Sequence, residues 1–318
     1  MIPCGCRFTV FTPTHDRVHT LPRVYQSLQA QTYRDFEWLI VDDGSTDNTE
    51  EVVRGWQQEA DFPVRYFWQP NRGKHVAFNH GVRQARGELF LTLDSDDACV
   101  PEALARFLHH WEAIPASRRH QFSAVTAHCM DQDGRLVGTS FPHDITDSDS
   151  LEIAYRFKVR GEKWGFHRTD VLKEYPFPEL EMTYLPEGVI WGKIARRYKT
   201  RYVNELLRIY YTDQPSLTRG ERHNPGRHAL GGRFQHLTVL NEATDYLLYS
   251  PLEFYRSGVH YVRFSLHSGL GLGQQLKDVR STYGRLICAA ALPVGIAVYL
   301  RDRSHLTSAP KKCSTDAL

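Results

Sequence analysis

Three aspartates stand close together where an apolar run ends. In "LTLDSDDACVP", residues 91–101, mostly apolar residues lead into Asp94, Asp96 and Asp97. Carboxylates this close repel one another, so an ionised cluster needs a cation or a helix N-terminus beside it. Mg²⁺ takes only one or two carboxylates from a protein, and phosphate oxygens and water complete its shell. The Asp-x-Asp pair therefore predicts a divalent metal that bridges to a diphosphate.

Two other interpretations of this cluster can be weighed from the residues alone. A calcium-binding EF-hand loop that starts at Asp94 needs Gly at its sixth position and Glu at its twelfth. The chain has Cys99 and Ala105 there, which excludes that loop. A helix predicted to begin at Pro101 favours acids near its start, which is enough to explain Asp97. It does not explain Asp94, which lies where the apolar run finishes.

Further polar clusters lie in "THDR" (14–17), "DDGSTD" (42–47) and "NRGK" (71–74). In the second of these, the carboxylate of Asp43 is suited to accept hydrogen bonds from a base N–H or from ribose hydroxyls, whereas Asp47 is predicted to cap the next helix. In the third, Lys74 stands just before a helix, where backbone N–H groups and a lysine can bind an anion. Lys74 taken alone is equally consistent with an exposed side chain.

Two histidine pairs suggest a metal site only at first sight. His15 and His19 are four residues apart in "HDRVH", without the glutamate of the zinc protease motif. His109 and His110 fall on a predicted helix, where we expect them at the surface. Neither pair is a predicted metal site.

The elements around these clusters indicate a parallel sheet. Strand patterns cover residues 7–13, 36–43, 64–69 and 88–94, and helical patterns cover 21–31, 47–60 and 75–87. Strands that alternate with helices form βαβ units with parallel strands. Ligands of such sheets bind outside the carboxyl ends of the strands. The polar clusters follow the first, second and fourth strands, so we expect them at one edge of the sheet.

The pattern changes after about residue 115. A hairpin is predicted over 122–138, a strand pair over 200–212, and a helix over 188–198 with Glu187 at its entry. Residues 216–239 are rich in Gly, Arg and His and are predicted to form a loop or lid, and helical patterns fill about 240–300. We therefore predict two halves of one α/β domain, 1–115 and 116–215, followed by a loop and helical extension over 216–318.

Composition narrows the class of protein. The 318 residues include 39 basic and 37 acidic groups, a net charge of +2, so nucleic acid is not an expected partner. The six cysteines include no CxxC pair, and we interpret them as free thiols in a reducing compartment. The N-terminal residues lack the apolar run of a signal peptide. These features predict a cytoplasmic protein.

One apolar run stands out in the C-terminal part, "LICAAALPVGIAVYL" over 286–300. It is short for a spanning helix, and basic residues flank it on both sides. Two interpretations remain open. The run forms a buried C-terminal helix, or it dips into a bilayer surface and makes the protein peripheral on the inner face of the membrane.

The motifs together resemble those of the family 2 glycosyltransferases, which use nucleotide sugars and have the GT-A fold. The resemblance covers about residues 7–213. The segments that carry it are "TPTHDR", "IVDDGSTDNT", "NRGKHVAFNHGVRQARGELFLTLDSDD" and "PEGVIWGKIARRYK". It implies a Rossmann-like, mixed but mostly parallel sheet flanked by helices, with a helical C-terminal extension.

The resemblance also implies roles on the donor side of a site. Pro13, Thr14 and His15 would line the base pocket, where the family usually has Tyr in place of His15. Asp43 would contact uracil or ribose, and Asp94 the ribose or the metal. Asp96 would hold Mg²⁺ or Mn²⁺ on the diphosphate of the donor.

On the acceptor side the family usually has Glu-Asp, and this chain has Glu187 followed by Gly188. Glu187 would be the general base. Trp164 and Tyr184 are candidates to stack on the acceptor or, alternatively, core residues. Arg219 or Arg222 would close over the diphosphate.

The implied activity is transfer of a sugar from a UDP-sugar to a hydroxyl of a saccharide or lipid-linked saccharide, with inversion, in polysaccharide or glycolipid biosynthesis. A nucleotidyltransferase is an alternative, although "THDRVHTLP" lacks the glycines that such enzymes carry after the first strand. A binding protein without activity is another, since Gly188 replaces the usual Asp. The Asp-x-Asp pair argues against it.

Overall fold

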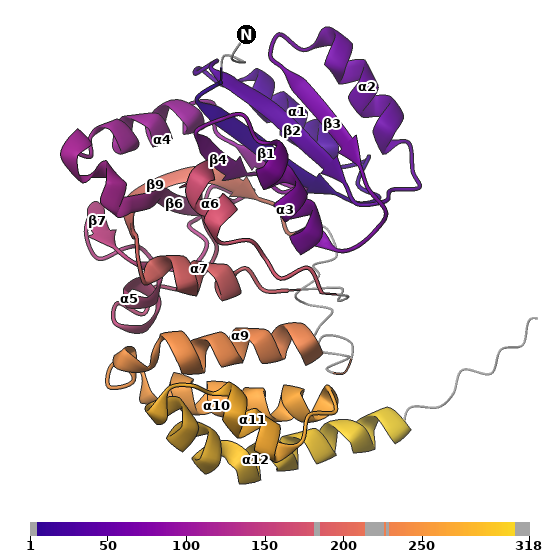
Figure 1. Cartoon of the computed structure of the whole chain (residues 1–318). Coiled ribbons are helices and arrows are strands. Elements are labelled where there is room, and N and C mark those ends of the chain that lie inside the picture. The colour runs from indigo at the N-terminus through magenta and orange to yellow at the C-terminus, as the bar shows by residue number, and fades with distance from the viewer. Residues whose placement is uncertain (1–4, 181–184, 214–225, 227–228, 309–318) are drawn as a thin grey trace, which may run out of the picture. The chain divides into compact units, whose positions relative to one another are not determined.

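The computed structural model describes residues 5–180, 185–213, 226 and 229–308. The chain divides into two compact units, Met1–Arg219 and Gly220–Leu318. The first unit is an α/β domain and the second is helical (Figure 1). The α/β fold with a helical C-terminal part is the fold class that the sequence predicts.

The described strands of the first unit form one mixed sheet. Its strands are β1 (Phe8–Thr14), β2 (Phe36–Asp42), β3 (Val64–Trp68), β4 (Leu89–Thr92), β5 (Ala98–Cys99), β6 (Phe122–Asp131), β7 (Ile145–Ser148), β8 (Lys163–Arg168) and β9 (Lys199–Tyr210). The order is β3-β2-β1-β4-β8-β6-β9-β5, and β7 pairs with β9. Strands β1 to β4 are parallel, as predicted, while β8 runs antiparallel to both β4 and β6.

Helices cover both faces of this sheet. They are α1 (Leu21–Gln29), α2 (Thr49–Glu59), α3 (Lys74–Gln84), α4 (Ala103–Glu112), η1 (Ala116–Gln121), α5 (Ser150–Tyr155), α6 (Thr169–Glu174) and α7 (Gly188–Ala195). On one face Tyr25 of α1 stacks on Trp38 and Trp56, with ring centroids 6.0 and 4.7 Å away. On the other face Phe78 of α3 packs edge-on against Phe11 and Phe90. Successive strand residues thus feed opposite cores, as a sheet buried on both faces requires.

Two local expectations in the second half of the domain are wrong. The predicted strand pair over 200–212 is the single long strand β9. The predicted hairpin has its turn at Asp133–Gly134, where Gly134 has φ 78°, but its second arm makes only an isolated bridge, Leu136 to Met130. Strand β6 pairs instead with β8 and β9, because these long-range partners bury both of its edges.

His110, which we expected at the surface, is buried. Its Nε2 lies 2.7 Å from Oε1 of Glu205, and Arg106 contacts the same carboxylate at 2.5 Å. Glu205 lies on β9, so this cluster joins α4 to the sheet. The local helix pattern around His110 gives no information about Glu205, which lies 95 residues further along the chain.

The second unit consists of α9 (Ala229–Glu242), η3 (Thr244–Tyr246), α10 (Pro251–His267), α11 (Leu272–Asp278) and α12 (Thr282–Ser308). Helix α9 begins inside the segment 216–239 that we expected as a loop. Its residues 229–239 include two adjacent glycines, and Gly232 lies against the ring of Phe264, where a Cβ would come within 2.7 Å. Packing that only glycine permits therefore overrides its low helix propensity.

Within the described residues, Thr282–Ser304 of α12 is long and apolar enough to cross a membrane by length and composition. Only 22% of the 18-residue apolar stretch within it is buried inside the structure. The run over 286–300 is thus helical, and it is neither a fully buried core helix nor an isolated one.

Candidate active site

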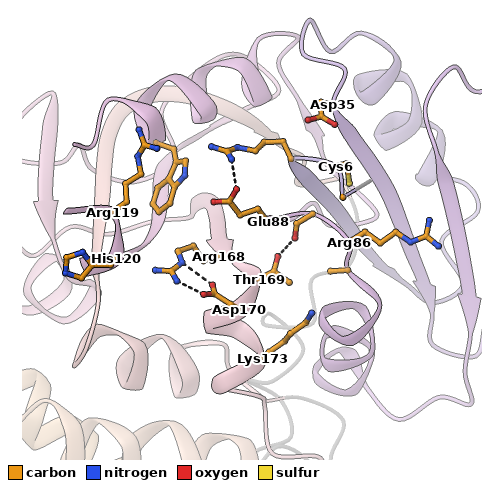
Figure 2. A pocket seen from close by; sticks show the side chains of 15 residues that line it. Cys6, Asp35, Arg86, Glu88, Arg119, His120, Arg168, Thr169, Asp170 and Lys173 are labelled. Atoms are coloured by element: carbon orange, nitrogen blue, oxygen red, sulfur yellow. Dashed lines mark hydrogen bonds and ion pairs between the residues drawn. The ribbon is translucent and has the colours of Figure 1, made fainter. Parts of the chain in front are cut away.

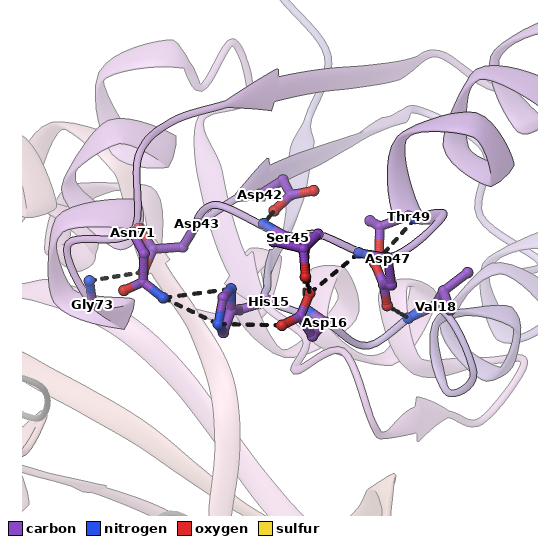
Figure 3. A network of polar contacts seen from close by, with 11 residues as sticks. His15, Asp16, Val18, Asp42, Asp43, Ser45, Asp47, Thr49, Asn71 and Gly73 are labelled. Carbon is purple, nitrogen blue, oxygen red and sulfur yellow. Dashed lines mark hydrogen bonds and ion pairs between the residues drawn. The ribbon is translucent and has the colours of Figure 1, made fainter. Parts of the chain in front are cut away.

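The loops after β1 and β2 are tied together at the carboxyl edge of the sheet (Figure 3). The Asp16 carboxylate accepts the Thr46 backbone N–H at 2.7 Å, and the Ser45 hydroxyl accepts that of Asp16 at 2.8 Å. The Asp47 carboxylate accepts the backbone N–H of Val18 at 3.0 Å and, in addition, that of Thr49 at the start of α2 at 3.1 Å. The "THDR" and "DDGSTD" clusters therefore form one fixed rim.

Asp43 holds the third loop on this rim (Figure 3). Its carboxylate accepts the backbone N–H groups of Gly73 at 2.7 Å and Arg72 at 2.9 Å, and the side-chain amide of Gln69 at 2.7 Å. These bonds set the loop that leads into α3. They leave Asp43 little capacity for a ligand, so its contact with a base or ribose stays a prediction.

Pro13 and Thr14 are the last residues of β1, and both are buried, whereas His15 is exposed on the rim. The side-chain amide of Asn71 lies 3.1 Å from Nε2 of His15 (Figure 3). Among the described residues, Oγ1 of Thr14 has no hydrogen-bond partner although it is buried. A buried hydroxyl without a partner costs free energy, so this atom marks a place where a polar ligand would be stabilised.

Lys74, the first residue of α3, joins the two sides of the site. Its Nζ lies 2.7 Å from Oδ1 of Asp94 and 3.2 Å from Oε1 of Glu187. Although burial opposes it, these carboxylates raise the pKa of Lys74 well above its usual value. Lys74 therefore stays charged and brings the acid at the end of β4 together with the acid at the start of α7.

Arg208 on β9 is the functional candidate that the sequence interpretation missed. Its guanidinium donates to Oδ2 of Asp94 at 2.8 Å and, through Nε, to Oδ2 of Asp97 at 2.8 Å. The other oxygen of Asp97 accepts the backbone N–H of Tyr211 at 3.0 Å. A charged residue inside the apolar stretch "LLRIYY" was the available signal, since a buried arginine needs an acidic partner.

This arrangement corrects the expectation for Asp97. Its side chain is 1% exposed, and it serves Arg208 and Tyr211 rather than the start of α4, which begins only at Ala103. Burial raises the pKa of Asp97 to about 6, and the guanidinium of Arg208 opposes that rise. The three aspartates thus differ by environment: Asp97 is structural, and Asp94 already faces two cations.

Of the three aspartates, Asp96 has the longest contact with a cationic side chain. Its side chain is 29% exposed, and Nη1 of Arg17 is 3.8 Å away. Burial and the charge of Asp94 raise the pKa of Asp96, so a further cation beside it would stabilise the ionised form. The described residues contain no group of three or more His, Cys, Asp or Glu placed to hold a metal. One or two carboxylates suffice for Mg²⁺ on a diphosphate, so the donor set at Asp96 fits such an ion.

A cavity of about 290 Å³ adjoins Asp94, Glu187 and Arg208. Its lining includes the stacked rings of His167 and Trp191, whose centroids are 4.2 Å apart with 5° between their planes. Burial lowers the pKa of His167 to about 4, so this ring is neutral at pH 7. The cavity thus offers a neutral aromatic wall beside the acids.

Of the aromatic residues predicted for the acceptor, Trp164 also lines this cavity. Trp164 is 3% exposed, its indole N–H donates to the backbone oxygen of Thr92, and its ring packs against Phe107 of α4. This packing favours the core role of Trp164. Tyr184, Arg219 and Arg222 lie outside the described residues.

A wider hollow of about 800 Å³ lies at the other edge of the sheet, near the amino ends of β1, β2 and β4 (Figure 2). Its lining carries several charges, but Arg7 pairs with Glu88, and Arg168 pairs with Asp170. Because ligands of open α/β sheets bind at the carboxyl ends of the strands, this hollow is not the candidate active site.

Comparison with known proteins agrees with this geometry. Residues 9–137 match the model of the glycosyl transferase family 2. An uncharacterized glycosyltransferase of Mycoplasma pneumoniae is 34% identical over 226 residues, which cover 65% of this chain and 68% of that protein. The chain belongs to the family 2 glycosyltransferases.

Three further proteins extend the comparison of this glycosyltransferase. A GalNAc(5)-diNAcBac-PP-undecaprenol beta-1,3-glucosyltransferase of Campylobacter jejuni is 28% identical over 235 residues, 71% of either chain. The S. aureus TarS fragment 1–349, solved with UDP-GlcNAc, superposes with a TM-score of 0.67 at 19% identity, over 95% of this chain and 91% of that one. A Pyrobaculum calidifontis mannosyltransferase, solved with GDP-Man and Mn²⁺, has a TM-score of 0.56 at 18% identity, over 95% and 89%.

These likenesses support the GT-A fold and an enzyme that uses nucleotide sugars in glycan biosynthesis. They favour a glycosyltransferase over a nucleotidyltransferase and over a binding protein without activity.

Proposed function

We propose that this glycosyltransferase moves a sugar from a UDP-sugar to a hydroxyl of a saccharide or lipid-linked saccharide, with inversion and with a divalent metal. The observation that carries the proposal is the position of Lys74, whose Nζ contacts Asp94 on the donor side and Glu187 on the acceptor side. These three side chains come from separate elements and meet at the edge where ligands of such sheets bind.

The donor base would lie against Pro13, Thr14 and His15, with the unpartnered hydroxyl of Thr14 as one contact. Asp43 and Asp94 would face the base and ribose. The similar TarS structure holds UDP-GlcNAc and the similar mannosyltransferase holds GDP-Man, which supports a nucleoside-diphosphate sugar. We favour UDP among these because the motif pattern resembles uracil-binding family members.

Asp96, with Asp94 beside it, would hold Mg²⁺ or Mn²⁺ on the donor diphosphate. When bound, this ion neutralises charge that develops on the leaving diphosphate. Asp94 already faces Lys74 and Arg208, so Asp96 is the main protein ligand in this proposal. The mannosyltransferase solved with Mn²⁺ supports the choice of ion.

Glu187 would act as general base in a single displacement. The acceptor hydroxyl gives its proton to the Glu187 carboxylate as its oxygen attacks the anomeric carbon, and the bond to the diphosphate breaks with both electrons on the diphosphate. Lys74 contacts Glu187 at 3.2 Å in this structure, so the carboxylate is engaged in an ion pair. A bound diphosphate competes for Lys74 and so would free Glu187 when the donor is in place. Much of the remaining rate enhancement would come from orienting the two bound sugars.

The acceptor proposal rests on a relative and on the C-terminal helix. The Campylobacter protein is named for an undecaprenol-linked saccharide. We infer that this chain also acts on a lipid-linked saccharide, in the cytoplasm at the inner face of the membrane, with residues 286–300 contacting that surface.

The proposal is tested by a screen of nucleotide sugars for metal-dependent hydrolysis. We expect release of UDP from one donor with Mg²⁺ or Mn²⁺ and none with a chelator, and Asp96→Asn to abolish UDP binding that depends on the metal. The matched control is Asp170→Asn, an acid in the hollow at the far edge of the sheet. Hydrolysis that persists with a chelator, or that Asp96→Asn leaves unchanged, would contradict the metal assignment. NMR of the transfer product would decide the anomeric outcome.

A further inference from the structure

Helix α12 packs one side closely against α10. A Cβ added at Gly295 of α12 would meet Val262 of α10 at 2.6 Å, and one at Gly258 of α10 would meet Ile287 of α12 at 2.9 Å. Cys288 and Ala291 of α12 are fully buried on the same side. Small residues thus let the two helices approach closely, and this side of α12 is buried within the helical unit.

A polar cluster holds the far end of α12 to the same helix. Asp302 is buried, and its carboxylate accepts hydrogen bonds from Nε of Arg263 at 2.5 Å and from Nε2 of His267 at 3.0 Å. Separating α12 from α10 would leave these buried charged groups without their partners, which is strongly unfavourable. The packing therefore opposes release of α12 as an independent spanning helix.

The opposite side of α12 is apolar and exposed. Leu286, Val294 and Leu300 are 63%, 43% and 57% exposed. Exposed alanines and Pro293 fill the turns between them, and no charged residue occurs over 286–300. This exposed apolar side, which we call the outer face of α12, runs about 22 Å at 1.5 Å per residue, less than the roughly 30 Å of a bilayer core.

Basic residues stand at both ends of the outer face. Arg285 precedes it, and Arg301 and Arg303 follow it, all three exposed. Arginines at the ends of an apolar stripe are typical of a helix that lies in the plane of an anionic bilayer, where the charged groups reach the phosphates and the apolar side chains enter the acyl boundary.

We propose that α12 binds an anionic lipid bilayer flat, through its outer face, while its inner side stays packed on α10. This deepens the proposed function, since a lipid-linked acceptor is presented at that surface, but the binding itself does not require transferase activity. The arginines at both ends of the outer face favour a bilayer over a second copy of this chain. If two copies met through this face in an antiparallel contact, their arginines would lie against each other and repel.

The test is flotation of the full-length chain with vesicles of phosphatidylcholine alone or of phosphatidylcholine with phosphatidylglycerol. We expect binding to the anionic vesicles, weak binding to the neutral ones, and release by alkaline carbonate. The variant Leu286→Gln, Val294→Gln, Leu300→Gln should lower the bound fraction by roughly tenfold or more, because three apolar side chains no longer leave water. Ile145→Gln, at an exposed position on β7, is the matched control and should bind as wild type.

Three results would overturn the proposal. In the first, the triple variant binds vesicles as well as wild type does. In the second, the bound wild-type chain is not released by alkaline carbonate, as is typical of a spanning protein. In the third, the wild-type chain does not bind vesicles and forms a dimer that the three substitutions disrupt. Nucleotide-sugar hydrolysis, measured on the same samples, should be equal in wild type and triple variant. Its absence from the wild type would contradict the proposed function and leave the bilayer binding standing.

Discussion

At the scale of single residues, the candidate site depends on which cation faces which acid. Lys74 and Arg208 hold the two oxygens of Asp94 at 2.7 and 2.8 Å, and Asp96 is left with Arg17 at 3.8 Å. Neighbouring aspartates therefore differ in what they can bind. The acid with the fewest protein partners is the one that we assign to the metal.

Glu187→Gln tests the base at this scale. We expect donor binding to persist and transfer to slow by roughly 10²–10⁴-fold, because the amide cannot take the acceptor proton. Binding is measured by calorimetry with UDP and metal, and transfer by product formation. Glu174→Gln is the control, since Glu174 ends α6 and pairs with Arg197. Transfer at a near wild-type rate in Glu187→Gln would remove Glu187 as the base.

Arg208→Met tests how much Arg208, which the sequence interpretation missed, contributes to stability. The change leaves Asp97 buried without its ion-pair partner, and we expect the free energy of unfolding to fall by about 3–5 kcal/mol. Denaturant unfolding measures it. Arg54→Met, which removes an exposed pair with Glu50 on α2, should cost only about 0–1 kcal/mol. Equal losses in the two variants would mean that the buried pair adds nothing beyond a surface one.

At the scale of elements, α3 organises both sides of the site. It begins at Lys74, and one turn later Asn79 is buried against the segment that precedes Glu187. The Asn79 amide donates to the backbone oxygen of Phe177 at 2.8 Å and its oxygen accepts the N–H of Phe177 at 2.9 Å. The helix thus fixes the chain that leads to the acceptor-side acid.

Asn79→Ala tests this coupling. Losing both bonds leaves the backbone of Phe177 unpaired, with an expected cost of about 1–3 kcal/mol in stability. Because Glu187 would be positioned less well, we expect kcat to fall about tenfold with the KM for the donor nearly unchanged. Gln57→Ala is the control. It removes an exposed hydrogen bond from the side chain of Gln57 on α2 to the backbone oxygen of Val64 on β3. A rise in KM at constant kcat would instead mean that Asn79 serves donor binding.

At the scale of the whole molecule, long-range ion pairs join the halves of the sheet domain. Hydrogen bonds from Arg106, aided by His110, lower the pKa of Glu205 from 4.5 to about 2. A carboxyl with a depressed pKa in the folded chain stabilises it fully above its unfolded value. That stabilisation is lost as the pH falls from about 4.5 through about 2.

Glu205→Gln should therefore flatten the acid side of the stability profile. Wild type and variant are compared by thermal unfolding at neutral pH and at pH values through this window. The gap between them should be largest at neutral pH and shrink as the pH falls, because only the wild type loses a charged partner. A gap that stays constant with pH would mean that the pair does not depend on ionisation.

The sequence by itself determined the parallel half of the sheet and the place of the site. Apolar strands β1, β2 and β4 each end in a polar cluster, and both the alternation with helices and the position of the clusters are local features. The helix with Glu187 at its entry was equally local, since α7 carries its own apolar stripe.

Only the tertiary structure decided the partners of those acids. Asp97 is contacted by Arg208 of β9 and by Tyr211 directly after that strand, and His110 is contacted by Glu205 of β9. These partners lie about a hundred residues further along the chain. Local spacing carries no information on such pairings, because they follow from how β9 enters the sheet beside β6. For the same reason the sequence left the two interpretations of residues 286–300 open, whereas the packing of α12 on α10 separated its buried side from its exposed one.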